Sequence, residues 1–115
     1  MPATKIATEP AFSTHIDLPE GDRRILIELL NARLADTADL YSQLKQAHWN
    51  VKGPNFFQFH QLFDQLAAEV FPLIDLIAER ATALGGVALG TPRMSAAHST
   101  LPEFPEEGVE GHSAA

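Results

Sequence analysis

Two helical patterns meet in residues 41–66, YSQLKQAHWNVKGPNFFQFHQLFDQL, where Lys52-Gly53-Pro54 separates them. On both sides of this tripeptide, apolar side chains recur at intervals of three and four residues, which is typical of one face of a helix. Glycine followed by proline ends a helix and turns the chain. The sequence therefore predicts a hairpin of two long antiparallel helices, over about residues 19–51 and 55–84.

The residues at the predicted helix ends fit this assignment. Pro19 suits a first helical turn, and Asn55 suits the N-cap of the second helix. Gly85-Gly86 would end that helix. Pro72 lies inside it, but the apolar pattern continues unbroken across the proline, so we predict one continuous helix.

The two ends of the chain lack a long apolar pattern. We expect residues 1–18 to form a flexible tail. Residues 87–115 are acidic and rich in proline and glycine, with one short helical turn beginning near Thr91-Pro92 and no strand pattern. The predicted fold class is therefore all-α, a helical hairpin followed by an irregular acidic segment.

Composition excludes several classes of function. The chain has 115 residues, no cysteine, and 8 Lys+Arg against 15 Asp+Glu, which gives a net charge of −7. One small domain is expected, without disulfides, thiolate metal sites or a cysteine nucleophile. The acidic balance argues against broad binding to nucleic acid. No stretch approaches the roughly 18 apolar residues of a membrane span, and the N-terminus lacks the apolar core of a signal peptide, so a cytoplasmic location is expected.

Four candidate metal ligands share one side of the second helix. They form two pairs with a spacing of four residues, His60–Asp64 and Asp75–Glu79. Each pair can place two side chains on one ion. The apolar core stripe of this helix falls on a different arc and consists of Leu62, Phe63, Leu66, Val70, Leu73, Ile74 and Ile77.

The two pairs cannot share an ion within one chain, because Asp64 and Asp75 lie roughly 16 Å apart along a helix. They could share one if two copies of the helix packed antiparallel about a two-fold axis near Glu69–Val70. Ala67 and Ala68 are small and would permit a close approach there. Such an interface would be isologous, as dimer interfaces usually are.

His48 offers a further ligand from the first helix. The short turn places it about level with His60. Imidazole and carboxylate ligands without thiolate suit iron or manganese, with zinc also acceptable. The combined set would be His48, His60 and Asp64 from one chain with Asp75 and Glu79 from a second.

Each of these residues also has an ordinary explanation. A histidine on an apolar helix face, such as His48, is more often packed in a core than bound to a metal. Helical carboxylates such as Asp75 and Glu79 are usually solvated. From spacing alone, a metal site and an ordinary helix surface remain equally open.

Several longer motifs resemble the Dps family, the ferritin-like miniferritins named for DNA protection during starvation. The resemblance covers about residues 24–112. Its motifs are QAHWNVKG at 46–53, Phe56, His60 and Asp64, IDLIAER at 74–80, and LGGVALG at 84–90.

The resemblance implies a ferritin-like four-helix bundle that assembles into a hollow dodecamer. Such proteins oxidise ferrous iron, preferably with hydrogen peroxide, and store it as a ferric mineral during oxidative stress. Their ferroxidase centre lies at a two-fold interface between subunits. Trp49 matches an aromatic residue beside the centre that is thought to contain one-electron chemistry, although simple packing explains it equally well. By motif position the metal ligands are His48, His60 and Asp64, with Asp75 and Glu79 from the partner chain.

Family members continue through a third and a fourth long helix, whereas this chain ends about where the third would begin. We therefore expect residues 19–115 to form a partial ferritin-like domain. Its expected partner is a second copy, bound through the two-fold interface of the second helix, and whether the family dodecamer forms is left open. If the shared site assembles, the chain would be a ferroxidase-type oxidoreductase acting on iron.

Two other functions are considered. The chain could be a non-catalytic helical module that dimerises or docks onto related proteins. It could also be a nucleoid-associated DNA-binding protein, since some family members bind DNA through a lysine-rich tail. Residues 1–18 hold Lys5 as their only Lys or Arg, so we expect weak or no DNA binding.

Overall fold

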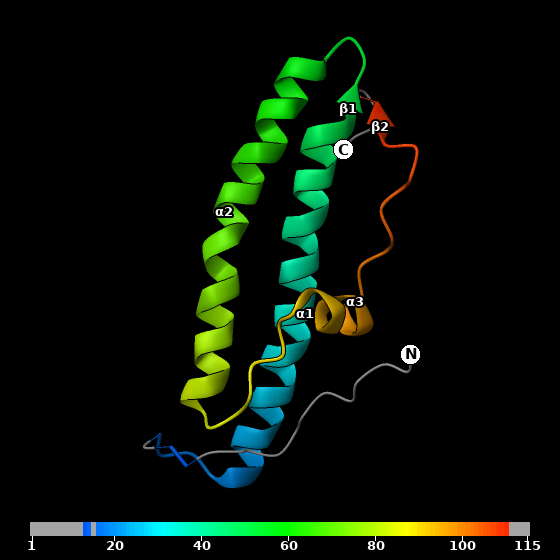
Figure 1. The fold of residues 1–115 in the computed structure, drawn as a ribbon. Helices are drawn as coiled ribbons and strands as arrows, with labels where there is room; N and C mark the ends of the chain where they lie inside the picture. Colours follow the sequence, from blue (N-terminus) through cyan, green and yellow to red (C-terminus); the bar gives the residue numbers. More distant parts are fainter. Residues whose placement is uncertain (1–12, 15, 111–115) are drawn as a thin grey trace.

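The structure, a computed structural model, describes residues 13–14 and 16–110. Helices α1 (Glu20–Asn50) and α2 (Phe56–Ala83) lie side by side and antiparallel (Figure 1). The helical hairpin predicted from the sequence is confirmed, and α2 continues through Pro72. Among the described residues, no helix is both long and apolar enough to cross a membrane.

The turn between the helices depends on Gly53. This residue has a φ of 106°, in the left-handed region that favours glycine. The backbone N–H of Phe56 donates to the Gly53 carbonyl at 3.1 Å. Asn55 occupies the N-cap position of α2 as predicted, but its side chain makes no capping hydrogen bond. The backbone of the turn therefore directs the start of α2.

The opposite end of the hairpin is capped by residues near the N-terminus. Most of the predicted flexible tail, residues 1–12 and 15, lies outside the described residues. Thr14 Oγ1 donates to the carbonyl of Ala83, and Arg23 donates to the carbonyl of Leu84 at 3.3 Å. The last carbonyls of a helix have no partner within it, so these contacts satisfy the C-terminus of α2.

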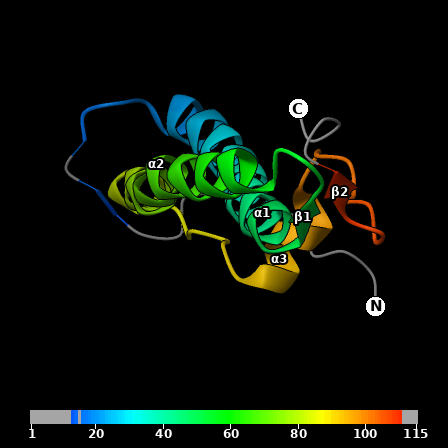
Figure 2. The same ribbon diagram turned by 90° about the horizontal axis from the view of Figure 1, so that it is seen from above.

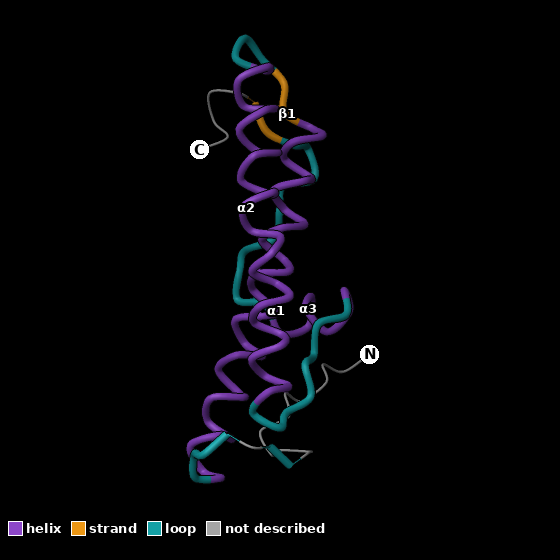
Figure 3. Tube along the Cα trace, turned by 90° about the vertical axis from the view of Figure 1, so that its left-hand side faces the viewer, coloured by secondary structure: helices purple, strands orange, loops and turns teal. Residues whose placement is uncertain are grey.

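Residues 84–110, here called the return segment, carry the chain from the end of α2 back to the turn. The segment includes α3 (Pro92–His98), which lies against α1 rather than α2 (Figure 2). In Figure 3, where α1 and α2 overlap, α3 projects to one side of the hairpin. The return segment therefore covers a face of α1 that α2 leaves open.

The return segment ends in a short parallel pairing. Strand β1 (Val51–Lys52) directly follows α1, and β2 (Val109–Glu110) pairs with it in the register Val51 with Val109. The expectation of no strand is therefore wrong at these residues. A strand of two residues shows no alternation of polar and apolar side chains, so sequence pattern cannot reveal it.

The buried core of the described chain is small. Among the apolar side chains, Ile27, Leu34 and Val51 are the largest that are fully buried. Within the predicted core stripe of α2, Phe63 is buried, whereas Leu62 and Leu73 are 42% and 45% exposed. Each long helix has only one long neighbour in the described chain, so part of each apolar stripe remains exposed.

Buried Asn31 joins α1 to the start of the return segment. Its Nδ2 donates to the Val87 carbonyl at 3.0 Å, and its Oδ1 accepts from the Leu89 N–H at 2.9 Å. Close contact at Gly86 supports this joint, because a Cβ there would lie 2.6 Å from Cγ2 of Ile27. The backbone of the return segment at Gly86 therefore packs directly against the Ile27 side chain of α1.

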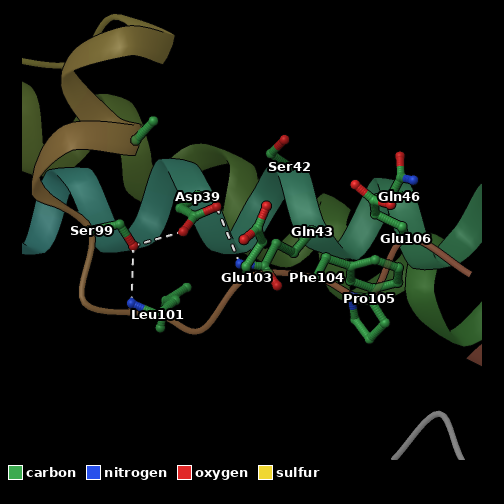
Figure 4. Close-up of a pocket in the computed structure, with 11 residues that line it drawn as sticks. Asp39, Ser42, Gln43, Gln46, Ser99, Leu101, Glu103, Phe104, Pro105 and Glu106 are labelled. Carbon is green, nitrogen blue, oxygen red and sulfur yellow. Dashed lines mark hydrogen bonds between the residues drawn. The ribbon is translucent and has the colours of Figure 1, made fainter. Parts of the chain in front are cut away.

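Two aspartates of α1 fasten the middle of the return segment. Asp36 accepts from the Thr100 N–H at 2.7 Å, and the Thr100 hydroxyl also donates to it. Asp39 accepts from Ser99 Oγ at 2.7 Å (Figure 4). The backbone hydrogen bond from Thr100 holds the pKa of Asp36 below its ordinary value of 3.8. The attachment therefore depends on an ionised carboxylate.

We expect Asp36→Asn to destabilise the chain by about 2 kcal/mol near neutral pH, because hydrogen bonds to a charged acceptor are lost. A lowered pKa in the folded chain contributes stability above the ordinary carboxyl pKa, and that contribution is lost as pH falls through the folded value. The difference between variant and wild type should therefore shrink below pH 3.8. Urea unfolding at several pH values measures it.

Asp17→Asn, at an exposed aspartate before α1, is the matched control. Hydrogen exchange at the Thr100 amide reports the attachment directly and should speed up only in Asp36→Asn. Equal stability and equal Thr100 exchange in the two variants would show that Asp36 does not hold the return segment.

Candidate metal centre

The turn between α1 and α2 places two imidazole rings face to face. His48 lies in the last turn of α1 and His60 near the start of α2, with ring centroids 3.8 Å apart and planes inclined by 19°. Phe56 also stacks on His60, at a centroid distance of 5.0 Å. The short segment 51–55 makes this meeting possible, because it leaves the adjoining helix ends level with each other.

Reciprocal hydrogen bonds fix the orientation of both rings. Nδ1 of His48 donates to the carbonyl of His60 at 2.5 Å, and Nδ1 of His60 donates to the carbonyl of His48 at 2.8 Å. A carbonyl oxygen can only accept, so each Nδ1 must carry the hydrogen. In a neutral imidazole the lone pair then resides on Nε2. This is the arrangement in which a histidine is preset to bind a metal ion through Nε2.

Asp64 lies next to the histidine pair. Its Oδ1 is 4.0 Å from Nε2 of His48. Two ligands that each bind one ion at about 2.1 Å can be at most about 4.2 Å apart, so this separation fits a shared ion. His48, His60 and Asp64, here called the first ligand group, open onto a pocket of about 520 Å³.

A lysine forms an ion pair with the carboxylate of this group. Nζ of Lys45 donates to Oδ1 of Asp64 at 2.8 Å. This hydrogen bond and the charge of the ammonium hold the pKa of Asp64 below its ordinary 3.8, and the same bond raises the pKa of Lys45 above 10.5. Asp64 is therefore ionised near neutral pH and already paired with a cation.

Asp75 and Glu79 form a separate carboxylate pair further along α2. A hydrogen bond between their side chains, with the charge of Asp75, raises the pKa of Glu79 above its ordinary 4.5. One α-helix places this pair roughly 16 Å from the first ligand group. Within residues 13–14 and 16–110, no three His, Asp or Glu side chains gather closely enough to hold a metal ion. One chain therefore presents two incomplete groups.

The α2 surface between the two groups is exposed and carries both apolar and polar side chains. Phe71 is 59% exposed, and Ala68 and Glu69 are also exposed, while Phe57, one turn before His60, is 61% exposed. Ala67, which we expect near a two-fold axis together with Ala68, is only 1% exposed within the single chain. Its methyl group is buried in the hairpin. Trp49, beside His48 on α1, is 64% exposed.

Sequence reasoning missed Lys45. The available signal was its position three residues before His48, on the same face of α1. Because the hairpin turn brings His48 and His60 level, a residue one turn before His48 comes level with one a turn after His60, which is Asp64. Lys45 is therefore part of this site, through its contact with Asp64.

Comparison with known proteins identifies the family of this chain. The profile of the ferritin-like domain family matches residues 27–112. A DNA protection during starvation protein of Agrobacterium fabrum is 39% identical over 99 residues, which cover 86% of this chain and 61% of that protein. DNA protection during starvation protein 1 of Deinococcus radiodurans is also 39% identical over 99 residues, 86% of this chain and 47% of that protein.

Solved structures give the same result. DpsC from Streptomyces coelicolor superposes with a TM-score of 0.80 at 38% identity, over 90% of this chain and 59% of that one. An archaeal Dps homologue from Halobacterium salinarum superposes with a TM-score of 0.78 at 33% identity, over 90% and 58%. The chain thus spans about three-fifths or less of the length of these relatives. With its matched domain, its relatives and its fold in agreement, this chain belongs to the ferritin-like family, in the Dps branch that these relatives represent.

Proposed function

We propose that this chain supplies ligands for the oxidation of ferrous iron at a site shared between two copies. Ferric iron would be retained as the product, and hydrogen peroxide would be the preferred oxidant. The observation that carries the proposal is the imidazole pair, in which both Nε2 atoms are left free beside an ionised carboxylate. The tautomer that lets each Nδ1 donate to a carbonyl is also the one in which each Nε2 can bind a metal ion.

The second copy would complete the ligand set. Antiparallel packing of two α2 helices across exposed Ala68 and Phe71 places the carboxylate pair of one chain opposite the first ligand group of the other. The dimer would then hold two equivalent sites. Three carboxylates and two imidazoles make a nitrogen–oxygen ligand set that suits iron.

The chemistry requires that electrons be delivered in pairs. Two ferrous ions supply the two electrons that break the O–O bond of one peroxide, which leaves as water or hydroxide and forms no hydroxyl radical. The carboxylates would stabilise the extra positive charge of ferric iron. Trp49 would stand beside the site as a donor that contains stray one-electron oxidation.

A test of the shared site uses two variants that are each inactive. His60→Ala/Asp64→Ala lacks the first ligand group, and Asp75→Ala/Glu79→Ala lacks the carboxylate pair. When the two chains are unfolded and refolded together, half of the dimers combine both variants, and each of these has one intact site. The rate of ferric absorbance after adding Fe²⁺ and peroxide should return to about a quarter of the wild-type rate.

Either variant refolded alone is the control and should show only the slow solution rate. Asp64→Asn provides a second version of the first variant, because it leaves the reciprocal histidine bonds in place. Circular dichroism checks that helix content is unchanged. If mixing restores nothing while each chain remains helical and dimeric, the ligands are not shared between copies.

Metal binding at the carboxylate pair should weaken in acid, because Asp75 raises the pKa of Glu79. Because the pKa of Glu79 is raised, this carboxyl takes up a proton above pH 4.5 as acidity increases. A divalent ion needs both carboxylates ionised, so it must displace that proton, and binding weakens from a pH above 4.5 downward. Carbon-13 NMR titration of the Glu79 carboxyl measures the effect.

Asp75→Asn is the comparison for this titration. Removing the neighbouring negative charge should lower the pKa of Glu79 toward its ordinary value. A Glu79 titration midpoint that is the same in wild type and Asp75→Asn would mean that the two carboxylates do not interact.

A non-catalytic helical module is the second candidate function. The observation in its favour is that no single chain gathers three metal ligands among the described residues. The exposed apolar surface of α2 would then serve association alone. Anaerobic Fe²⁺ titration separates the two functions, since a module without a metal site binds no iron at the first ligand group.

The names of the Agrobacterium and Deinococcus relatives refer to DNA protection, so DNA is a further candidate partner. With a net charge of −7, this chain offers little attraction for phosphate. We expect a mobility shift to be absent, or to disappear between low salt and about 150 mM salt. A shift that survives at the higher salt would contradict this expectation.

A further inference from the structure

Lys45 lies between two pockets of the hairpin. On one side, its Nζ donates to Oδ1 of Asp64 at 2.8 Å, and that same oxygen is 4.0 Å from Nε2 of His48. A divalent cation bound to this oxygen would stand next to the ammonium group. Two positive charges repel each other strongly at such a distance, so the ammonium must leave when the cation arrives.

The second pocket offers a place for the displaced side chain. It has a volume of about 520 Å³, lies between α1, α2 and α3, and is lined in part by Lys45 itself. Tyr41 and Trp49 contribute aromatic surface, which attracts cations. Asp39 adds a carboxylate from α1. We call this cavity the α3 pocket.

Ser95 is a lining residue of the α3 pocket and carries a buried hydroxyl without a partner among the described residues. The residue is 5% exposed, and its buried Oγ has no hydrogen-bond partner in the described part of the chain. Buried hydroxyls are normally paired, so an unpaired one calls for an explanation. An ammonium entering the α3 pocket would supply the missing donor.

We propose that Lys45 is a two-position side chain that pairs with Asp64 in the metal-free site and moves into the α3 pocket, against Ser95, when a divalent cation binds. The inference rests on the proposed function, because it takes Asp64 to be a metal ligand. Lys45 is a positioning residue. Without metal it pairs with the charge of the carboxylate, and its flexible stem lets the charged end move while the backbone stays in place.

In this arrangement, Lys45 and the metal ion compete for the carboxylate of Asp64. Ser95 favours metal binding because it receives the displaced lysine. Removing the charge should strengthen metal binding. Removing the receiving hydroxyl should weaken it, but only when the lysine is present. The two substitutions are therefore predicted to be non-additive, which simple structural damage would not produce.

Anaerobic calorimetry with Zn²⁺ tests this on four chains: wild type, Lys45→Met, Ser95→Ala and the double variant. Lys45→Met keeps an unbranched side chain and should bind Zn²⁺ about fivefold more tightly, the most that an exposed ion pair is worth. Ser95→Ala should bind about threefold more weakly, as loss of one modest hydrogen bond implies. In the Lys45→Met background, Ser95→Ala should change nothing. Lys45→Arg, which keeps the charge, is the control.

NMR shows the movement directly. Zinc is diamagnetic, and the ε-methylene protons of Lys45 should shift upfield on zinc addition as they come under the rings of Tyr41 and Trp49. Lys52, an exposed lysine in the turn, is the control and should not shift. An unchanged Lys45 resonance in a zinc-bound chain would overturn the two-position proposal.

The outcomes separate this inference from the proposed function. If neither wild type nor Lys45→Met binds Zn²⁺, the metal site itself is absent and both proposals are wrong. If both bind with equal affinity, the metal site stands and the role of Lys45 is wrong. If Ser95→Ala weakens binding equally with and without Lys45, Ser95 does not receive the lysine.

Discussion

The reciprocal hydrogen bonds between His48 and His60 are the interaction on which the turn end of the helical hairpin depends. They join the end of α1 to the start of α2 across a turn that only a glycine at position 53 permits. The same bonds place the hydrogen of each ring on Nδ1 and leave Nε2 free. These two hydrogen bonds therefore close the hairpin and orient both rings, and under the proposed function the site would be organised by folding before any ion arrives.

Attachment of the return segment is the second constraint. Asn31 holds its start, Asp36 and Asp39 hold its middle, and the pairing of β1 with β2 holds its end. These contacts carry the chain from one end of the hairpin to the other along α1, so the described chain finishes beside β1, next to the turn. The apolar stripe of α2 receives no such cover, which leaves Leu62 and Leu73 available to further helices or another copy.

Charge divides the candidate site into two groups with different character. Asp64 is paired with Lys45 and has a lowered pKa, whereas Asp75 and Glu79 repel each other and the pKa of Glu79 is raised. Under the proposed function, metal binding would displace a cation from one group and, in acidic solution, a proton from the other. A site shared between two copies would combine both exchanges, and the affinity for iron would then depend on a side chain that binds no metal.

Local sequence determined the helices and the ligand faces. Gly53-Pro54 and Gly85-Gly86 mark helix ends through local backbone properties that need no distant partner, and a pitch of 3.6 residues places His60 with Asp64 and Asp75 with Glu79. Tertiary structure alone decided the rest. Lys45 meets Asp64 from 19 residues away, Asp36 meets Thr100 from 64 residues away, and β1 finds β2 across most of the chain. Such contacts leave no periodic signal, because they depend on where the turn and the return segment bring the backbone, which no single stretch of sequence specifies.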